Sequence, residues 1–463
     1  MATAVTERLR NYLEAFHALG AEERRQPAWL RALRERAFAR FCETGFPTTK
    51  DEDWRFTNVN AIARTPFQPA RDARRSGAIY GDTLEACRIP GASCQLVFLN
   101  GRFAPELSDL GSLPQGVRAG SLAETIAQHG ESLEAHLGRY VNIDRDAFCA
   151  LNTAFIEDGA YVYLPRRTVL EAPICFLFIS IPGDDPEMTH PRSLIVAEDA
   201  TEASIVEDYV SLGSGVFFSN AVTELVAGED AVISHYLIER EDRQAFNVST
   251  LRTQQARSAN VSSHSVLLGG GLVRNNVHPV LGGEGGECLI NGLFIGNGSQ
   301  HMDNYMLVEH ASPHCSSRQF YNGILDGHSH GVFHGRIIVH KDAQKTDAKQ
   351  TNRNLLLSDD AQIDTKPQLE IYADDVKCTH GATIGQVEEN ALFYMRSRGI
   401  DETSARSLLL LAFANECLDR MKCRPVREYL QDLVQGWLPG TSTAAGTDAA
   451  RGGEVARRWE EVG

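Results

Sequence analysis

The feature that most constrains this chain is a series of short apolar segments, separated by Gly, Asp and Asn turns, that starts near residue 160. Val196–Ala200 (Val-Ala-Glu-Asp-Ala) is echoed by Val226–Ala231, 30 residues further on, and Leu356–Ala361 repeats the pattern once more. A strand–turn–strand unit that recurs at about 30 residues is typical of a β-solenoid, in which each coil buries apolar side chains against its neighbours. A β-sandwich also has short strands and Asp-rich turns. The repeat favours the solenoid and leaves the sandwich open.

The segments on either side of these strands have the period of helices. Residues 4–44 carry apolar side chains at three- and four-residue spacing, which predicts helix. From about residue 396 the pattern is helical again, with Asp401 as an expected N-cap and Pro425 in the first turn of a second helix. We therefore expect an N-terminal helix-rich domain, a β core, a C-terminal helical domain and a flexible tail, over residues 1–158, 159–395, 396–438 and 439–463.

Charge and hydropathy limit the partners of the chain. Its 45 Lys and Arg residues against 61 Asp and Glu residues give a net charge of −16, which argues against binding to nucleic acid or to an anionic membrane. The longest apolar runs, such as Ile174–Ile181 and Leu408–Ala414, fall below the roughly 18 residues of a membrane span, and no secretory signal is visible. We expect a cytoplasmic protein.

The ten cysteines are spread along the chain without any C-x-x-C pair. A zinc finger or a self-contained iron–sulfur site needs clustered thiolates. Any metal chemistry would therefore use isolated ligands, or ligands shared with another chain.

Gly327–Gly331 (Gly-His-Ser-His-Gly) matches the G-x-S-x-G motif of hydrolases, with Ser329 in the place of the nucleophile. That motif works on a strained turn between a strand and a helix, whereas the segment that follows here, Val332–Val339, has the composition of a strand. A polar turn between two strands is the favoured interpretation. A β-helical hydrolase or lyase that uses Ser329 remains the alternative from a different functional class.

Eight of the fifteen histidines lie between His301 and His380. On a strand, His334 would share one face with Arg336, and His328 and His330 could join them as a metal-binding row. A solvated turn with incidental histidines is favoured over such a row.

Cys378-Thr379-His380 is the sharper candidate for metal chemistry. Residues two apart on a strand point the same way, so the thiolate and the imidazole could face one external cluster. Thiolate is the usual ligand of iron–sulfur clusters and imidazole replaces it in some of them. A buried cysteine beside a hydrogen-bonded histidine is the competing interpretation, which spacing alone favours.

The chain has neither a P-loop, G-x-x-x-x-G-K-[ST], nor a G-x-G-x-x-G after a strand. Without a convincing set of catalytic residues, the sequence indicates a scaffold and not an enzyme.

Several segments are together similar to the SufB/SufD family of iron–sulfur cluster assembly proteins. The segments that carry this resemblance are Lys345–Ala348, Asn352–Ser358, Lys366–Ile371, Asp374–Thr383, Phe393–Ile400 and, more weakly, Glu52–Thr57. Within the family, His380-Gly381-Ala382-Thr383 and Arg396-Ser397-Arg398-Gly399 look like SufD, because SufB tends to carry C-E-H-E at the first site and glutamine in the second.

The resemblance implies a right-handed parallel β-helix core between helical N- and C-terminal domains. It implies pairing with a SufB-like subunit through the edges of the β-helix, docking of a SufC-like ATPase on the C-terminal helices, and a possible homodimer of the isolated chain. A nascent Fe–S cluster would form transiently at the subunit interface, with His380 and Cys378 as ligands beside a cysteine of the partner. We expect the His380 imidazole to face outward from the stacked coils.

The resemblance assigns no role to His328, His330 or His334, and it is silent about the tail after residue 438. A SufB-like subunit that holds the cluster itself is the alternative within the family.

Overall fold

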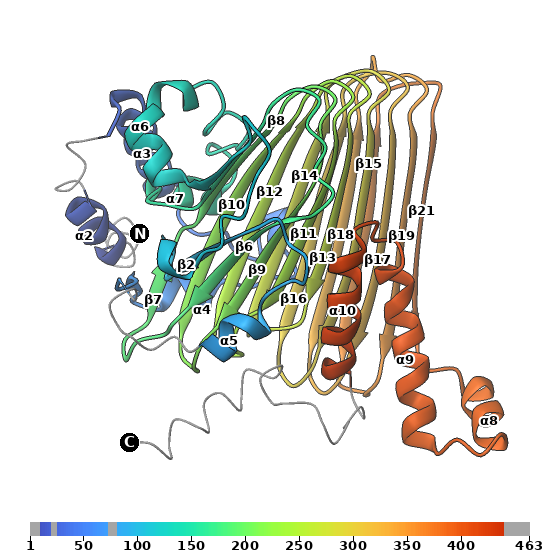
Figure 1. The fold of residues 1–463 in the computed structure, drawn as a ribbon. Helices are drawn as coiled ribbons and strands as arrows, with labels where there is room; N and C mark the ends of the chain where they lie inside the picture. The colour runs from blue at the N-terminus through green and yellow to red at the C-terminus, as the bar shows by residue number, and fades with distance from the viewer. Residues whose placement is uncertain (1–9, 20–25, 73–80, 439–463) are drawn as a thin grey trace.

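Parallel β-strands make up most of the chain between Cys94 and Gly385. The computed structural model describes residues 10–19, 26–72 and 81–438 of the 463-residue sequence. Its strands form two sheets. From residue 192 to residue 385 successive strands of the chain alternate between the sheets, and the chain winds as a β-solenoid of about eight turns (Figure 1). The predicted fold class, a mainly β solenoid with helices at both ends, is confirmed.

We call the two sheets sheet A and sheet B. The parallel coil strands of sheet A are β5 (Ala160–Leu164), β8 (Arg192–Ala197), β10 (Phe217–Ala227), β12 (Phe246–Gln255), β14 (Leu272–Leu281), β16 (His301–His310), β18 (His330–Val339) and β20 (Gln362–Ile371). Those of sheet B are β2 (Cys94–Leu99), β6 (Ile174–Ser180), β9 (Glu202–Ser211), β11 (Val232–Arg240), β13 (Asn260–Leu267), β15 (Glu287–Gly296), β17 (Ser316–Leu325), β19 (Asp347–Leu356) and β21 (Lys377–Gly385).

The 30-residue echo in the sequence corresponds to one coil. Val226 in β10 lies beside Val196 in β8 in parallel register, and the turns that follow them stack, with the Ala200 N–H donating to the Glu229 carbonyl at 2.7 Å. The prediction that Leu356–Ala361 repeats the same turn is wrong. It leads from sheet B to sheet A, whereas the first two turns lead from sheet A to sheet B.

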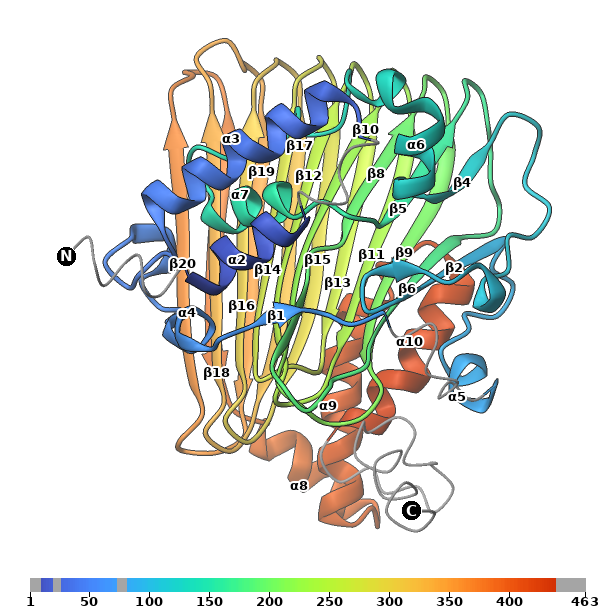
Figure 2. The same cartoon turned by 90° about the vertical axis from the view of Figure 1, so that its left-hand side faces the viewer.

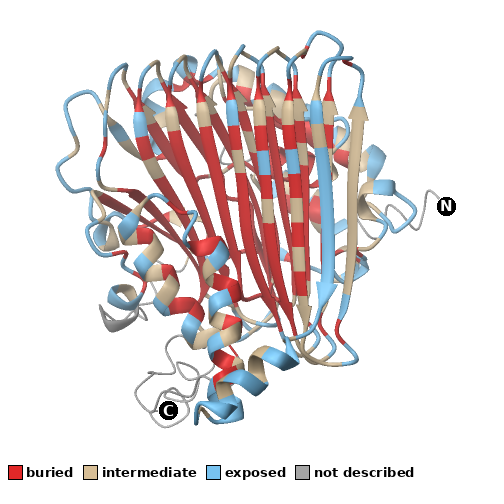
Figure 3. Ribbon diagram, turned by 90° about the vertical axis from the view of Figure 1, so that its right-hand side faces the viewer, coloured by how far each residue is buried: buried red, intermediate tan, exposed pale blue. Residues whose placement is uncertain are grey.

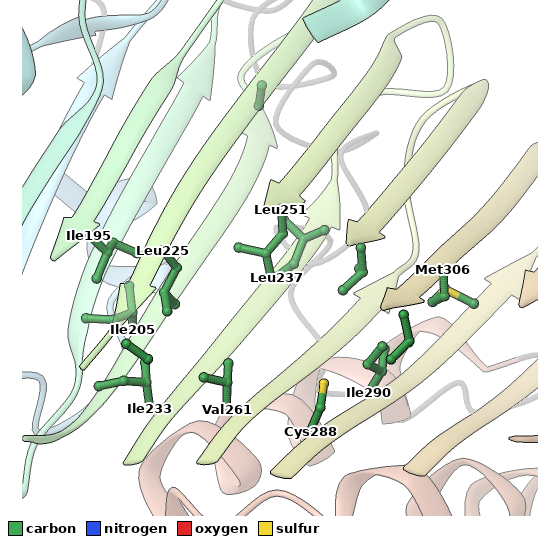
Figure 4. Packing of buried hydrophobic residues seen from close by; sticks show 14 of the residues in the cluster. Ile195, Ile205, Leu225, Ile233, Leu237, Leu251, Val261, Cys288, Ile290 and Met306 are labelled. Atoms are coloured by element: carbon green, nitrogen blue, oxygen red, sulfur yellow. The ribbon is translucent and has the colours of Figure 1, made fainter. Parts of the chain in front are cut away.

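The inner faces of the two sheets enclose a long apolar core. Along each strand alternate residues point inward, and residues paired in register stack from coil to coil. Figure 4 shows such stacked side chains, among them Ile195 beside Leu225 and Ile233 beside Val261. All four are almost fully buried.

Helices of the N-terminal region cover the outer face of sheet A (Figure 2). They are α2 (Arg10–Leu19), α3 (Ala28–Thr44), α4 (Asn60–Arg64), α6 (Leu122–Leu133) and α7 (Ala147–Ala154). Phe41 and Phe148 belong to one buried cluster with Phe218 and Val248 from sheet A. The helix predicted over residues 4–44 is thus two helices, and part of that prediction lies outside the described residues.

Three helices end the described chain, namely α8 (Glu389–Ser397), α9 (Glu402–Leu418) and α10 (Arg424–Trp437). Helices α9 and α10 lie on the outer face of sheet B (Figure 3), where Leu410 and Leu430 are buried against Tyr236 and Leu293. The two predicted helix starts are confirmed, because Asp401 accepts a hydrogen bond from the Ser404 N–H at 2.9 Å and Pro425 lies in the first turn of α10. Among the residues described, no helix combines the length and apolar character of a membrane span.

The four-part division of the chain stays a prediction, and the expected tail over residues 439–463 lies outside the described residues.

Candidate functional site

The solenoid is open at the end formed by the last strand of each sheet. Strand β20 pairs only with β18, and β21 pairs only with β19, in the part of the chain that the structure describes. Figure 3 shows a strand at this end that is exposed along almost its whole length, as β21 is. An uncovered edge presents backbone donors and acceptors to any partner that can extend the sheet.

The register shows which backbone groups are free at this edge. The Lys377 N–H donates to the Thr346 carbonyl, so odd-numbered residues of β21 bond to β19 and the N–H and C=O groups of Cys378, His380, Ala382 and Ile384 point away from the solenoid. In β20 the Gln362 N–H donates to the Ser329 carbonyl, which places the odd-numbered residues on the free side. Both sheets can therefore accept a further strand.

Cys378 and His380 share the inner face of β21. They lie beside Ala348 and Gln350, which are both 1% exposed and point into the interior of the solenoid. His380 is nevertheless exposed, because no further coil covers it. The expectation that the imidazole faces outward from the stack is thus corrected. The ring lies on the lumenal side of β21, which is the side that faces the space between the two sheets, and it is exposed to solvent at the open end.

The two candidate ligands differ in their surroundings. Cys378 is half-buried against the inner apolar core, and this burial raises the pKa of its thiol. Metal ligation by cysteine requires the thiolate, so the environment of the unpartnered chain disfavours Cys378 as a ligand. His380 is exposed at the open end.

His330 and His334 lie on the outer face of sheet A, His328 lies in the turn before β18, and all three have partners. His330 Nε2 lies 2.8 Å from Asp364 Oδ2, and His334 Nε2 lies 2.6 Å from Gln368 Oε1. His328 contacts Asp360 at 3.6 Å. Within the described ranges no three His, Cys, Asp or Glu residues are arranged to hold a metal ion.

Ser329 lies in the turn between β17 and β18, and its side chain is fully buried. A strand and not a helix follows it, as predicted, so the strained turn of a nucleophile elbow is not formed. The polar-turn interpretation of this motif is supported.

A second exposed region lies on the terminal helices. Phe393 and Tyr394 in α8 are 74% and 59% exposed, and Leu408 in α9 is 48% exposed. Between α8, α9 and the end of the solenoid lies a cavity of about 440 Å³ with Arg396 and Arg406 in its wall. Phe393 and Tyr394 belong to the segment Phe393–Ile400 that carries the family resemblance, but no contact surface was predicted for them from the sequence. Two adjacent aromatic residues on an exposed helix are a usable signal of such a surface.

Helix α9 is fixed to the solenoid by polar contacts as well as by apolar packing. Asn322 donates to the Phe413 carbonyl at 2.8 Å, and Asn291 donates to the Cys417 carbonyl at 2.9 Å. Arg353 in β19 forms an ion pair with Glu416. The helix therefore contacts β15, β17 and β19 directly, and β19 is the neighbour of the strand that carries His380.

Comparison with known proteins identifies the family. The model of the "SUF system FeS cluster assembly, SufBD core domain" matches residues 179–413, and that of the "SufBD protein N-terminal region" matches residues 7–176. An iron–sulfur cluster assembly SufBD family protein, slr0076 of Synechocystis, is 34% identical over 84% of this chain and 86% of its own length. The SufD proteins of Escherichia coli and Bacillus subtilis are 29% and 24% identical, over 93% and 92% of this chain and 97% and 96% of their own lengths. The chain therefore belongs to the SufBD family of iron–sulfur cluster assembly proteins.

Proposed function

We propose that this chain is the SufD-like subunit of a SUF scaffold and that it contributes His380 to the site where an iron–sulfur cluster forms. The observation that carries the proposal is the position of His380, exposed on the last strand at the open end of the solenoid. A ligand in that position can meet ligands of another chain without rearrangement of this one. The similarity to two proteins named SufD supports the choice within the family.

The partner at the open end would be a SufB-like subunit that continues both sheets. Free N–H and C=O groups alternate along β20 and β21, and strand addition to such edges gives affinity through backbone hydrogen bonds. The same edges would allow two copies of the isolated chain to pair as a homodimer. One imidazole and one half-buried thiol are too few ligands for a cluster, so the chain alone would hold none stably.

A SufC-like ATPase would dock on the terminal helices. Phe393, Tyr394 and Leu408 supply exposed apolar surface there, which is the kind of surface that a partner covers. The contacts of α9 with the solenoid, through Asn322, Asn291 and Arg353, provide a route by which movement of the helices would reach the open end. In this proposal the chain is a scaffold subunit and performs no catalysis itself.

The test is co-purification of the full chain with its SufB-like and SufC-like partners, followed by iron and sulfide analysis. His380→Ala should leave the complex intact and reduce the cluster yield, because one ligand is missing. His328→Ala is the matched control, since the His328 side chain is 76% exposed and lies in the turn between β17 and β18, away from the strand that carries His380. A normal cluster yield from His380→Ala would refute the site.

A SufB-like role is the remaining alternative. Anaerobic reconstitution of the chain by itself separates the two roles. A SufD-like chain should lose its iron and sulfide on desalting, and a SufB-like chain should retain them.

A further inference from the structure

Buried polar side chains form a row along the inner face of sheet A. Ser249, Asn275 and Asn304 lie beside one another on β12, β14 and β16 and are at most 6% exposed. Ser249 Oγ, Asn275 Nδ2 and both amide atoms of Asn304 have no hydrogen-bond partner among the described residues. Because buried polar groups in proteins nearly always bond to protein or to ordered water, the row requires an explanation.

A small cavity at one end of this row indicates what the partner is. Its volume is about 10 Å³, the space of about one water molecule, and its walls include His235, Ser249 and Asn275. His235 Nε2 is engaged with Glu207 at 3.0 Å, which leaves Nδ1 without a protein partner. Three polar atoms around a space of this size match the usual surroundings of a buried water.

The same situation recurs directly beneath the open end. Gln319, Gln350 and His380 lie in one column on β17, β19 and β21. The two glutamines are 2% and 1% exposed, and neither side-chain amide has a partner in the described parts of the chain. The column thus leads from two buried, unsatisfied amides to the exposed imidazole.

Gly335, on the facing sheet, provides the room for these amides. A Cβ atom placed on Gly335 would lie 3.0 Å from Gln319 Oε1 and 3.1 Å from Gln350 Nε2. Both amide groups therefore point across the lumen toward a residue without a side chain. Two buried amides that approach the same residue and have no protein partner among the described residues are suited to hold water.

We propose that ordered water bound to Gln319 and Gln350 accepts a hydrogen bond from the ring N–H on the lumenal side of His380, which makes the two glutamines positioning residues for the imidazole. A neutral imidazole has one donor and one acceptor nitrogen. Once the lumenal nitrogen is engaged, the orientation of the ring and its tautomer are fixed, and the other nitrogen faces the open end. Groups that orient a ligating histidine in this way are a regular part of metal sites.

The role of this water in positioning a cluster ligand rests on the proposed function, whereas the water site itself rests on the geometry alone. The test therefore uses the full chain without iron or partners. Histidine is labelled with ¹⁵N, and the His380 ring signals are assigned by their loss in His380→Gln. At a pH where the ring is neutral, the native chain should show two well-separated ring ¹⁵N shifts, as one tautomer gives.

Gln350→Leu is the principal variant, because leucine fills similar space and cannot bind water. It should bring the two His380 shifts together, since both tautomers are then populated, and Gln319→Leu should do the same to a smaller extent. Gln368→Leu is the matched control, because Gln368 lies on the outer face of β20 beside His334, and it should leave the His380 shifts unchanged. Unchanged shifts in Gln350→Leu would overturn the proposal.

A high-resolution crystal structure of the native chain gives a second measurement if Gln350→Leu does not fold. Density for water between the Gln350 amide and the His380 ring is expected, and a dry contact would overturn the proposal. These outcomes are distinct from those of the cluster assay. A fixed ring with a normal cluster yield in His380→Ala would refute the cluster role alone, and a freely exchanging ring with a lowered yield would refute the water site alone.

Discussion

At the scale of single residues, a buried ion pair joins the N-terminal region to the solenoid. Arg192 and Glu224 are both fully buried, with their side-chain atoms 2.6 Å apart. Arg192 also donates to Asn152 at 2.9 Å, and Glu224 accepts from the backbone N–H groups of Gly138 and Tyr140 at 2.7 and 2.9 Å. The covering segment is thus fixed to β8 and β10 through Arg192 Nη1 and both carboxylate oxygens of Glu224.

Glu224→Ala should lower the free energy of unfolding by about 3–5 kcal/mol, because it leaves the Arg192 charge buried without a partner. Glu229→Ala is the matched control, since Glu229 forms an exposed ion pair with Arg257, and it should cost at most about 1 kcal/mol. Urea unfolding followed by circular dichroism measures both. Equal effects of the two substitutions would contradict the assignment.

Buried histidines make the stability of the chain depend on pH. Burial lowers the pKa of His190 and of His264 to about 3 and that of His301 to about 4. An unfolded histidine titrates near pH 6.5, so between about pH 4 and 6.5 these rings take up protons only on unfolding. The free energy of unfolding should therefore fall as the pH drops below about 6.5, by about 1.4 kcal/mol per pH unit for each ring.

His264→Phe tests this dependence at one position, because phenylalanine can keep the stacking on Tyr236, whose ring lies 4.9 Å away. The slope of unfolding free energy against pH between 6 and 5 should become smaller by about 1.4 kcal/mol per unit. His328→Phe, at an exposed position, should leave the slope unchanged. Parallel curves for the native chain and His264→Phe would exclude the explanation.

At the scale of elements, the Glu52–Thr57 segment acts as a clamp on the outer face of sheet A. The Arg274 guanidinium lies 3.7 Å from the Trp54 ring centre and 4.9 Å from that of Tyr305, and it also forms an ion pair with Asp303. Two residues before Trp54, Glu52 accepts a hydrogen bond at 3.0 Å from Lys366 on the edge strand β20. The clamp therefore connects the N-terminal region to the open end of the solenoid.

Trp54→Ala should release this clamp, because it removes a cation–π contact worth about 2 kcal/mol when desolvated, together with the buried ring surface. Hydrogen–deuterium exchange should increase in residues 52–57 and in β20, while the coils near β10 keep their protection. Trp54→Phe should restore most of the protection, since an aromatic ring is again present. Unchanged exchange in Trp54→Ala would show that the segment is held by other contacts.

The sequence predicted which segments form strands and helices better than it predicted which side chains contact each other from coil to coil. The spacing of Val196 and Val226 predicted a coil, because stacked coils repeat the same environment at the same interval. The partners of the histidines were not predictable from local spacing, since His330 and His334 contact residues 34 positions away on the next coil of sheet A. The lumenal face of His380 was missed for the same reason, because it follows from the register of β21 against β19.

At the scale of the whole molecule, the open end offers free strand edges through which the proposed assembly can be tested. Ala382 contributes its N–H to the free side of β21, whereas the N–H of Gly381 faces β19. Proline is tolerated where the missing N–H would have pointed away from the sheet, and Pro367 already occupies such a position on β20. The two neighbouring positions therefore allow the free edge to be altered separately from the fold.

Ala382→Pro should leave the thermal stability of the isolated chain unchanged. It should weaken pairing at the open end at least about tenfold, because the loss of one backbone hydrogen bond together with steric strain costs about 1.4 kcal/mol of binding free energy. Gly381→Pro should instead lower the thermal stability, because it removes a bond within the sheet. Ala382→Val retains the N–H and should pair normally. Sedimentation measures self-association, and capture of a SufB-like subunit measures the mixed pair. If Ala382→Pro pairs as tightly as the native chain by both methods, the partner does not extend sheet B, and assembly must use another surface.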